Sequence, residues 1–198
     1  QEIESELFWV DSLRNQGVVK TAKPLELEKG GKIAILYHEE EERFVVGFEF
    51  LSGAEPVPGD DLRENFFTLG EITAKLHNQS KSWPIPVGFQ RKMWDFDSML
   101  GYQPLWGDWR NALGLTAEGR IILENVAARL EKELQLYGKD RGRFGLIHAD
   151  LRLANLLVDN DVRSVIEFDD CGCSWFMYDF AAAISFMEED EQIPQLQK

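Results

Sequence analysis

The sequence predicts an α+β fold in two unequal parts. Three observations support this division. Two strand-like runs lie near the N-terminus, a stretch rich in glycine and proline follows at residues 52–59, and helical periodicity dominates the longer remainder. We therefore assign residues 1–53 to a first part of one helix and several strands, and residues 54–198 to a mostly helical second part, with a hinge expected near residues 52–59.

The first part opens with a helix expected at residues 2–15, where apolar side chains recur at helical spacing until Gly17 ends the pattern. Two strands are expected next, KIAILY at residues 32–37 and FVVGFEFL at residues 44–51. Four consecutive glutamates lie between them. Because like charges repel one another and favour water, residues 38–43 are expected to form the charged end of a hairpin.

The second part is expected to contain helices at residues 62–78, 117–137 and 175–189. Thr116 precedes the second of these and is suited to cap its N-terminus. The apolar face of that helix, expected to turn inward, consists of Ile122, Val126, Leu130 and Leu134. Residues 79–115 show no clean period and contain four of the six tryptophans, which is typical of aromatic packing between short helices or of a substrate pocket.

Composition limits the function classes. The formal net charge is −14, from 21 Lys and Arg against 35 Asp and Glu. This argues against a nucleic-acid partner, whose phosphates need a basic surface, and is compatible with a cationic small substrate. No apolar run approaches the roughly 20 residues that span a bilayer, and no signal segment opens the chain. A cytoplasmic protein without a membrane partner is therefore expected, and the oligomeric state is left open.

Side chains that could react or bind a metal are concentrated in residues 145–170, GLIHADLRLANLLVDNDVRSVIEFDD. Two short strands, LLV and SVI, flank a turn and bring Asp150, Asn155 and Glu167 to the ends of a predicted hairpin. Donors that are all oxygen suit Mg²⁺, which usually shares its coordination shell with substrate phosphates. Beside such a metal, Asp150 could accept a proton from an attacking hydroxyl group.

Other interpretations of this stretch are weaker. His148 is expected to orient the loop rather than to react. A zinc site would use Cys171, Cys173 and His148, but it lacks a fourth ligand and the usual spacing of ligand pairs. The acid-pair chemistry of a glycoside hydrolase depends on the separation of two carboxyl groups, which the sequence does not fix.

The pattern His-x-Asp-x-x-x-x-Asn, followed by a strand, an acid, Phe and Asp, has the order and register of a kinase catalytic loop and metal loop. In LIHADLRLANLLV, VIEFDD and YDFAAAISF the sequence resembles the aminoglycoside phosphotransferase family, which includes choline and homoserine kinases. EIESELFWVDSL resembles the family's N-lobe helix, FVVGFEFLSG its hinge, and WDFDSMLGYQPLWGDWR a further family segment. The resemblance covers nearly the whole chain. It implies a protein-kinase-like two-lobe fold with a partial N-lobe sheet and a mostly helical C-lobe.

The resemblance also implies ATP as phosphoryl donor, Mg²⁺ as cofactor, and a hydroxyl-bearing small molecule such as an aminoglycoside, choline or homoserine as acceptor. By position, Asp150 matches the catalytic base and Asn155 matches one magnesium ligand. Glu167 falls where the second magnesium ligand is found. Asp179 matches an acid that braces the catalytic loop, and His148 supports the same loop.

In the N-lobe, the resemblance matches Glu6 to the helix glutamate that pairs with a phosphate-binding lysine. It also implies that the backbone of Glu49, Phe50 and Leu51 meets adenine. The family's phosphate-covering loop and strand lysine are not found in residues 1–198, and neither are its last helices. We therefore expect Glu6 to lack a partner. We also expect these residues to be part of a longer protein and to be inactive, or nearly so, when alone.

A second departure is Glu167, where the family has aspartate. The extra methylene lengthens the side chain inside a coordination shell that tolerates little misplacement. Glu167 therefore keeps alternatives open: a catalytically impaired pseudokinase or a nucleotide-binding module. A Ser/Thr protein kinase of the stress-response type is a further alternative.

Overall fold

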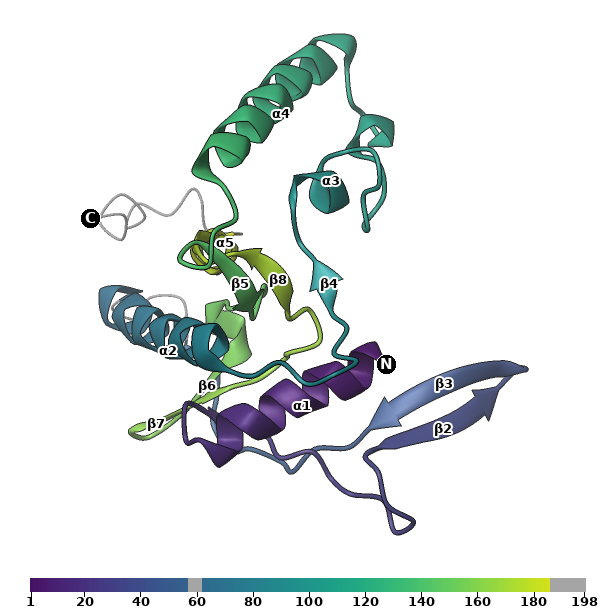
Figure 1. The fold of residues 1–198 in the computed structure, drawn as a ribbon, viewed down its shortest axis with the longest axis vertical. Coiled ribbons are helices and arrows are strands. Elements are labelled where there is room, and N and C mark those ends of the chain that lie inside the picture. The colour runs from purple at the N-terminus through teal and green to yellow at the C-terminus, as the bar shows by residue number, and fades with distance from the viewer. Residues whose placement is uncertain (57–61, 186–198) are drawn as a thin grey trace.

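The computed structural model describes residues 1–56 and 62–185, and its elements follow an α+β order (Figure 1). Helix α1, Glu2–Asn15, confirms the helix predicted at residues 2–15. It begins with acidic residues in its first turn and has a basic residue in its last turn, which suits the helix dipole. Trp9, Val10 and Leu13 are buried on its inner face, so α1 forms one wall of the main core.

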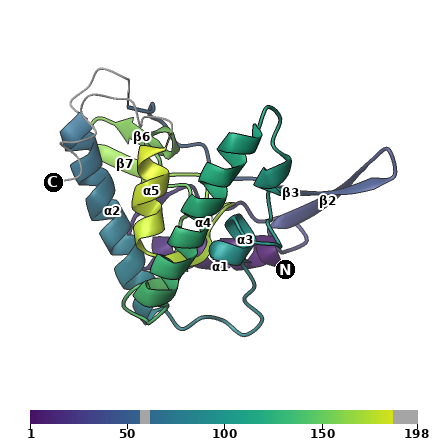
Figure 2. The same cartoon turned by 90° about the horizontal axis from the view of Figure 1, so that it is seen from above.

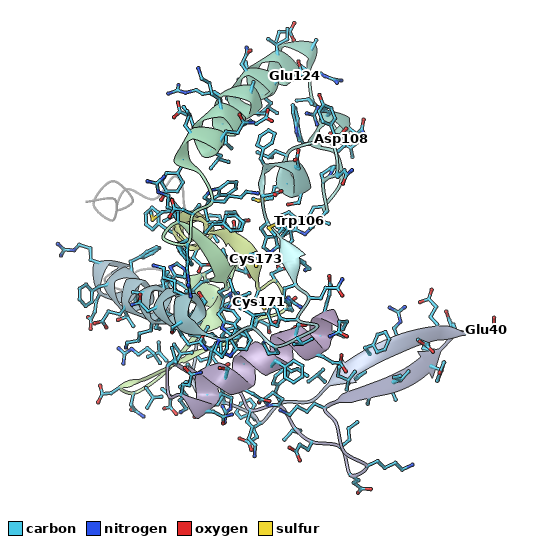
Figure 3. The ribbon with its side chains drawn as sticks, viewed as in Figure 1. Glu40, Trp106, Asp108, Glu124, Cys171 and Cys173 are labelled. Atoms are coloured by element: carbon cyan, nitrogen blue, oxygen red, sulfur yellow. The ribbon has the colours of Figure 1, made fainter. Side chains whose placement is uncertain are left out.

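Strands β2, Ile33–His38, and β3, Glu41–Val46, form an antiparallel hairpin with Ile33 opposite Val46. The prediction that residues 38–43 form the charged end of a hairpin is confirmed, and the strands extend further than predicted, to a two-residue turn. Glu39 and Glu40 form that turn, with φ of 49° and 68°. Positive φ at both positions matches the twist of the strands, and this outweighs the repulsion between the glutamates. Figure 3 shows Glu40 at the far tip of the hairpin, away from the rest of the molecule.

Two three-stranded sheets lie between the helices and frame the site. The first has the order β1-β7-β6 and the second the order β4-β8-β5. Their strands are β1 Lys20–Thr21, β4 Lys92–Met93, β5 Phe144–Ile147, β6 Leu156–Asp159, β7 Val162–Val165 and β8 Gly172–Trp175. The predicted hairpin of LLV and SVI is confirmed as β6 and β7. The chain passes from β5 into β6 and from β7 into β8 through two loops, which therefore lie side by side between the sheets.

The longer helices are α2 Leu62–Ser82, α4 Ala117–Tyr137 and α5 Met177–Ile184. Short helices are α3 Phe96–Met99, η1 Trp109–Asn111 and η2 Leu153–Asn155. The bounds of α4 match the prediction, whereas α2 continues four residues past the predicted end at Asn78. In both views α5 lies between α2 and α4 (Figures 1 and 2). The end predicted for α5, at residue 189, lies outside the described residues.

The predicted inward face of α4 was wrong. Ile122, Val126 and Leu130 are 62%, 55% and 38% exposed, and Ala127 is the buried residue of this helix. The periodicity of the face is real. Leu134 is half-buried and lines a cavity with Phe96 of α3, but within the described part of the chain no element covers the other three residues. The apolar face therefore stays on the surface of the structure.

The predicted hinge lies beside the site. Ala54 pairs with Val158 of β6 through two backbone hydrogen bonds of 3.1 and 2.8 Å. The expected hinge residues 57–59 lie outside the described part of the chain. Across residues 1–56 and 62–185, none of the helices is long and apolar enough to cross a membrane.

Candidate active site

The loop after β5 has a strained backbone that is braced from outside. Ala149 has φ of +70°, a conformation that L-residues rarely adopt unless their surroundings enforce it. Its N–H donates a 2.8 Å hydrogen bond to Oδ1 of Asp179, which is 1% exposed in α5. The other oxygen of Asp179 lies 2.7 Å from Nε2 of His77 in α2. Two helices therefore fix the backbone that leads into Asp150.

His148 joins this loop to the end of β7. Its ring is fully buried, and Nε2 lies 3.0 Å from the carbonyl oxygen of Ile166. Nδ1 accepts a hydrogen bond from the N–H of Asp150 at 3.3 Å. These partners select the neutral tautomer with the proton on Nε2, and burial lowers the pKa of His148. A neutral histidine with both nitrogens engaged is suited to positioning the loop.

The Asp150 carboxylate is held by two side chains from its own loop. Arg152 donates to both oxygens, from Nε at 2.7 Å and from Nη2 at 3.1 Å. Nδ2 of Asn155 donates to Oδ2 at 2.7 Å and to the Asp150 carbonyl at 2.8 Å. With Nδ2 committed to Asp150, the carbonyl oxygen of the Asn155 amide is the atom of this side chain that can serve as a ligand.

Glu167 directly follows Ile166, whose backbone is hydrogen-bonded to the loop that contains Asp150. The N–H of Ile166 donates to the Asn155 carbonyl at 3.0 Å. Glu167 has φ of +60° and an exposed side chain. Phe168, the next residue, is buried, with its ring 5.6 Å from that of Trp9 and 4.6 Å from that of His148. A strained acidic residue between two fixed neighbours is a feature that concentrates at functional sites.

The residues predicted to contact the nucleotide, together with Glu167, line one cavity of about 410 Å³. Its lining includes all five residues matched to nucleotide or metal binding on this side, namely Glu6, Glu49, Phe50, Leu51 and Glu167. His148, Asp150 and Asn155 belong to the adjoining loop and Asp179 belongs to α5; these four are not among the described residues that line the cavity. A larger cavity of about 540 Å³ between α2 and α5 has a mainly apolar lining and contains none of the predicted site residues.

The prediction that Glu6 lacks a partner was wrong. Nη1 of Arg91 lies 3.7 Å from Oε2 of Glu6, and both side chains are largely buried. Burial raises the pKa of Glu6, with Arg91 acting in the opposite direction. Asp169 and Glu167 raise the pKa further, since their negative charges disfavour another carboxylate nearby. Glu6 therefore belongs to an acidic cluster that Arg91 and, to a smaller extent, Lys92 partly neutralise.

The available donors fit a magnesium ion that shares its ligands with a nucleotide. Within residues 1–56 and 62–185, no group of three or more His, Cys, Asp or Glu side chains could hold a metal. One amide oxygen from Asn155 and one carboxylate from Glu167 remain, and Mg²⁺ is usually held by one or two carboxylates together with substrate phosphates. Burial raises the pKa of the Cys171 thiol to about 12, which disfavours the thiolate that a zinc site would need.

Sequence reasoning missed three of the residues that build this site. Arg152 stands inside the recognised motif, so its position was the available signal. His77 carried no signal, because its contact with Asp179 joins residues 102 positions apart. Arg91 lies in the segment without periodicity, where a basic Arg-Lys pair was the one hint of an acidic partner.

Comparisons with known proteins identify chains that are similar in sequence and fold. A solved structure described as the microcompartment-associated aminopropanol kinase is 41% identical, with a TM-score of 0.91 over 99% of this chain and 62% of its own. An amicoumacin kinase solved with AMP-PNP, Ca²⁺ and Ami shares the fold, at 20% identity and a TM-score of 0.74 over 98% of this chain and 57% of its own. The curated amicoumacin kinase of Bacillus subtilis (strain 168) is 26% identical over 178 residues.

That curated alignment covers 89% of this chain and 50% of the relative, so the chain spans about half the length of the curated protein it matches. Relatives of this kind are named as kinases that act on small molecules. A family model described as "Phosphotransferase enzyme family" matches residues 1–198. The fold, the order of the motif residues and this full-length match lead to one conclusion: the chain belongs to the phosphotransferase enzyme family.

Proposed function

We propose that the protein containing these residues transfers the γ-phosphoryl group of ATP to a hydroxyl group of a small molecule. The observation that carries this proposal is the fixed Asp150 carboxylate. A strained and braced backbone positions it, and the loop that holds it is bonded to the strand that ends at Glu167. Phosphoryl transfer depends mainly on positioning and on charge neutralisation, which such a rigid loop supports.

In this proposal Asp150 accepts the proton of the attacking hydroxyl group at one of its carboxylate oxygens. His148 and Asp179 hold the loop, and Asn155 orients the carboxylate through its Nδ2. Asn155 and Glu167 would hold Mg²⁺, which when bound supplies charge neutralisation at the phosphates. The 410 Å³ cavity, with the backbone of residues 49–51 along it, would take the nucleotide.

For the acceptor we propose a small alcohol that carries an amino group. The 41% identity to a protein described as an aminopropanol kinase supports this class. The formal charge of −14 also supports it, because an acidic protein attracts cations to its surface.

The test uses the full-length protein with ATP, Mg²⁺ and a panel of acceptors: aminopropanol, choline, homoserine, an aminoglycoside and, as matched control, propanol without the amino group. The readouts are ADP release and the phosphomonoester signal in ³¹P NMR. We expect phosphorylation of at least one amino alcohol and little of propanol. ADP release without a phosphomonoester, or no turnover with any acceptor, would contradict the proposal.

A second candidate is an impaired kinase or a nucleotide-binding module, and Glu167 is the observation that favours it. Glu167→Asp separates the two functions in the full-length protein. For an active enzyme built around glutamate, we expect the substitution to change turnover by less than about tenfold and to act mainly on the metal requirement. If the wild type shows no turnover and Glu167→Asp raises turnover strongly, the protein is an impaired kinase. A wild type and variant that both bind nucleotide without turnover would identify a binding module.

A further inference from the structure

Arg91 stands directly before β4, and its side chain is 3% exposed. Each nitrogen of its guanidinium has a partner. Nε donates to the Cys171 carbonyl at 2.6 Å, Nη1 donates to the Glu2 carbonyl at 3.1 Å, and Nη2 donates to the Asp169 carbonyl. With the ion pair to Glu6, one buried side chain joins helix α1 to the loop that follows Glu167.

This loop is held by side chains and not by a strand ladder. The carbonyl groups of residues 169, 170 and 171 are consecutive, and all three accept hydrogen bonds from the β4 region. Arg91 supplies the first and third bonds, and Nε1 of Trp94 supplies the second at 2.7 Å. Nζ of Lys92 also lies 2.7 Å from a carboxylate oxygen of Asp170. The segment 91–94 therefore fixes the course of the chain just past Glu167.

The strained backbone of Glu167 needs support on both sides. On its N-terminal side, Ile166 is bonded through its N–H to Asn155 and through its carbonyl to His148. On its C-terminal side, beyond buried Phe168, the ties to the rest of the molecule run through Arg91 and its neighbours. A positive φ at a non-glycine residue persists only when its surroundings enforce it.

The charge of Arg91 acts on the same cluster. Glu6, Glu167 and Asp169 influence one another, and their mutual repulsion would push α1 away from the loop. The Arg91 guanidinium, which pairs with Glu6 and donates to the Asp169 carbonyl, opposes this repulsion and ties α1 to the loop. Lysine could supply the charge, but it could not span three carbonyl groups with a planar fork.

We propose that Arg91 is a positioning residue for phosphoryl transfer: it sets the orientation of Glu167 and couples that orientation to the position of α1. The inference rests on the proposed function, because it assigns to Arg91 the placement of a metal ligand. Outer partners of metal ligands typically change metal affinity or activity by about 10–100-fold when they are replaced.

The test compares Arg91→Lys with Arg14→Lys in the full-length protein. Arg14 donates from the last turn of α1 to the Thr21 carbonyl, so it is a matched arginine that does not touch the loop. Three properties are measured. They are the Mg²⁺ dependence of turnover, the Mn²⁺ affinity in the presence of AMP-PNP, taken from the EPR signal of free Mn²⁺, and the unfolding temperature.

We expect Arg91→Lys to raise the half-saturating Mg²⁺ concentration and to weaken Mn²⁺ binding, each by about tenfold. Arg14→Lys should lower the unfolding temperature without changing either metal readout.

If Arg91→Lys does not fold, Trp94→Phe decides the question, because it removes the N–H that donates to the Asp170 carbonyl; the unfolding temperature reports the packing lost with the smaller ring. Its expected effect is a loss of Mn²⁺ affinity of about threefold or more. An Arg91→Lys variant, or failing that Trp94→Phe, with wild-type metal dependence overturns the inference and leaves the proposed function intact. A wild type without turnover overturns the proposed function, and the Mn²⁺ measurement still tests Arg91. A wild type that binds no Mn²⁺ with AMP-PNP overturns both.

Discussion

At the residue scale, His148 shows how burial and hydrogen bonding set a protonation state. Its two ring nitrogens are engaged by Ile166 and Asp150, and desolvation lowers its pKa from the ordinary value of 6.5. The folded protein therefore keeps this histidine neutral at a pH where the unfolded chain takes up a proton. Because the folded pKa is lowered, the stability that depends on neutral His148 is complete above about pH 6.5 and is lost as the pH falls below it.

This predicts a measurable difference in acid sensitivity. Between about pH 7.5 and about pH 5.5, the wild type should lose unfolding free energy through His148, because the unfolded chain takes up a proton there and the folded protein, with its lowered pKa, does not. His148→Asn should lack this component, so its unfolding free energy should fall less over the same range. Urea unfolding at the two pH values measures the effect. His38→Asn, which changes an exposed histidine of the hairpin, should follow the wild type. Equal losses in all three proteins would show that His148 is not held neutral.

At the element scale, local chemistry sets the ends of helices, and neighbours set which face is buried. Oγ1 of Thr116 accepts a 3.0 Å hydrogen bond from the N–H of Gly119, so the N-terminus predicted for α4 is correct. The face predicted to turn inward is exposed, because periodicity indicates that a face is apolar without indicating what covers it. The hairpin end at residues 38–43 was predicted, but the extension of both strands to Glu39 and Glu40 was not, because the pairing of two strands outweighs the local charge pattern.

The cap of α4 supplies a prediction at this scale. Thr116→Ala should lower the free energy of unfolding by about 1 kcal/mol, because the N–H of Gly119 loses its side-chain partner. Thr73→Ala is the matched control, since the hydroxyl group of Thr73 bonds to the Leu69 carbonyl inside α2 and completes no helix end. Urea unfolding should show a change near zero for that control. Similar losses for both variants would mean that the α4 cap makes no specific contribution.

At the scale of the whole molecule, the site lies where α1, the two small sheets and the segment before β4 meet. The catalytic motif could be predicted from the sequence, because Asp150 and Asn155 are five residues apart and their loop is local. Asp179 and Glu6 could be placed by family resemblance. Arg91 and His77 could not be predicted, because their contacts join positions far apart in the chain. The sequence therefore indicates the candidate site residues, whereas the packing of distant segments determines how firmly those residues are held.

The proposed phosphoryl transfer depends most on Asp150 as the acceptor of the hydroxyl proton. The direct measurement is the rate of phosphoryl transfer by the Asp150→Asn variant of the full-length protein, together with its affinity for AMP-PNP. We predict that kcat falls by at least about 100-fold while nucleotide affinity stays close to that of the wild type, because Asp150 lies outside the cavity assigned to the nucleotide. An Asp150→Asn variant that keeps wild-type kcat would contradict the account.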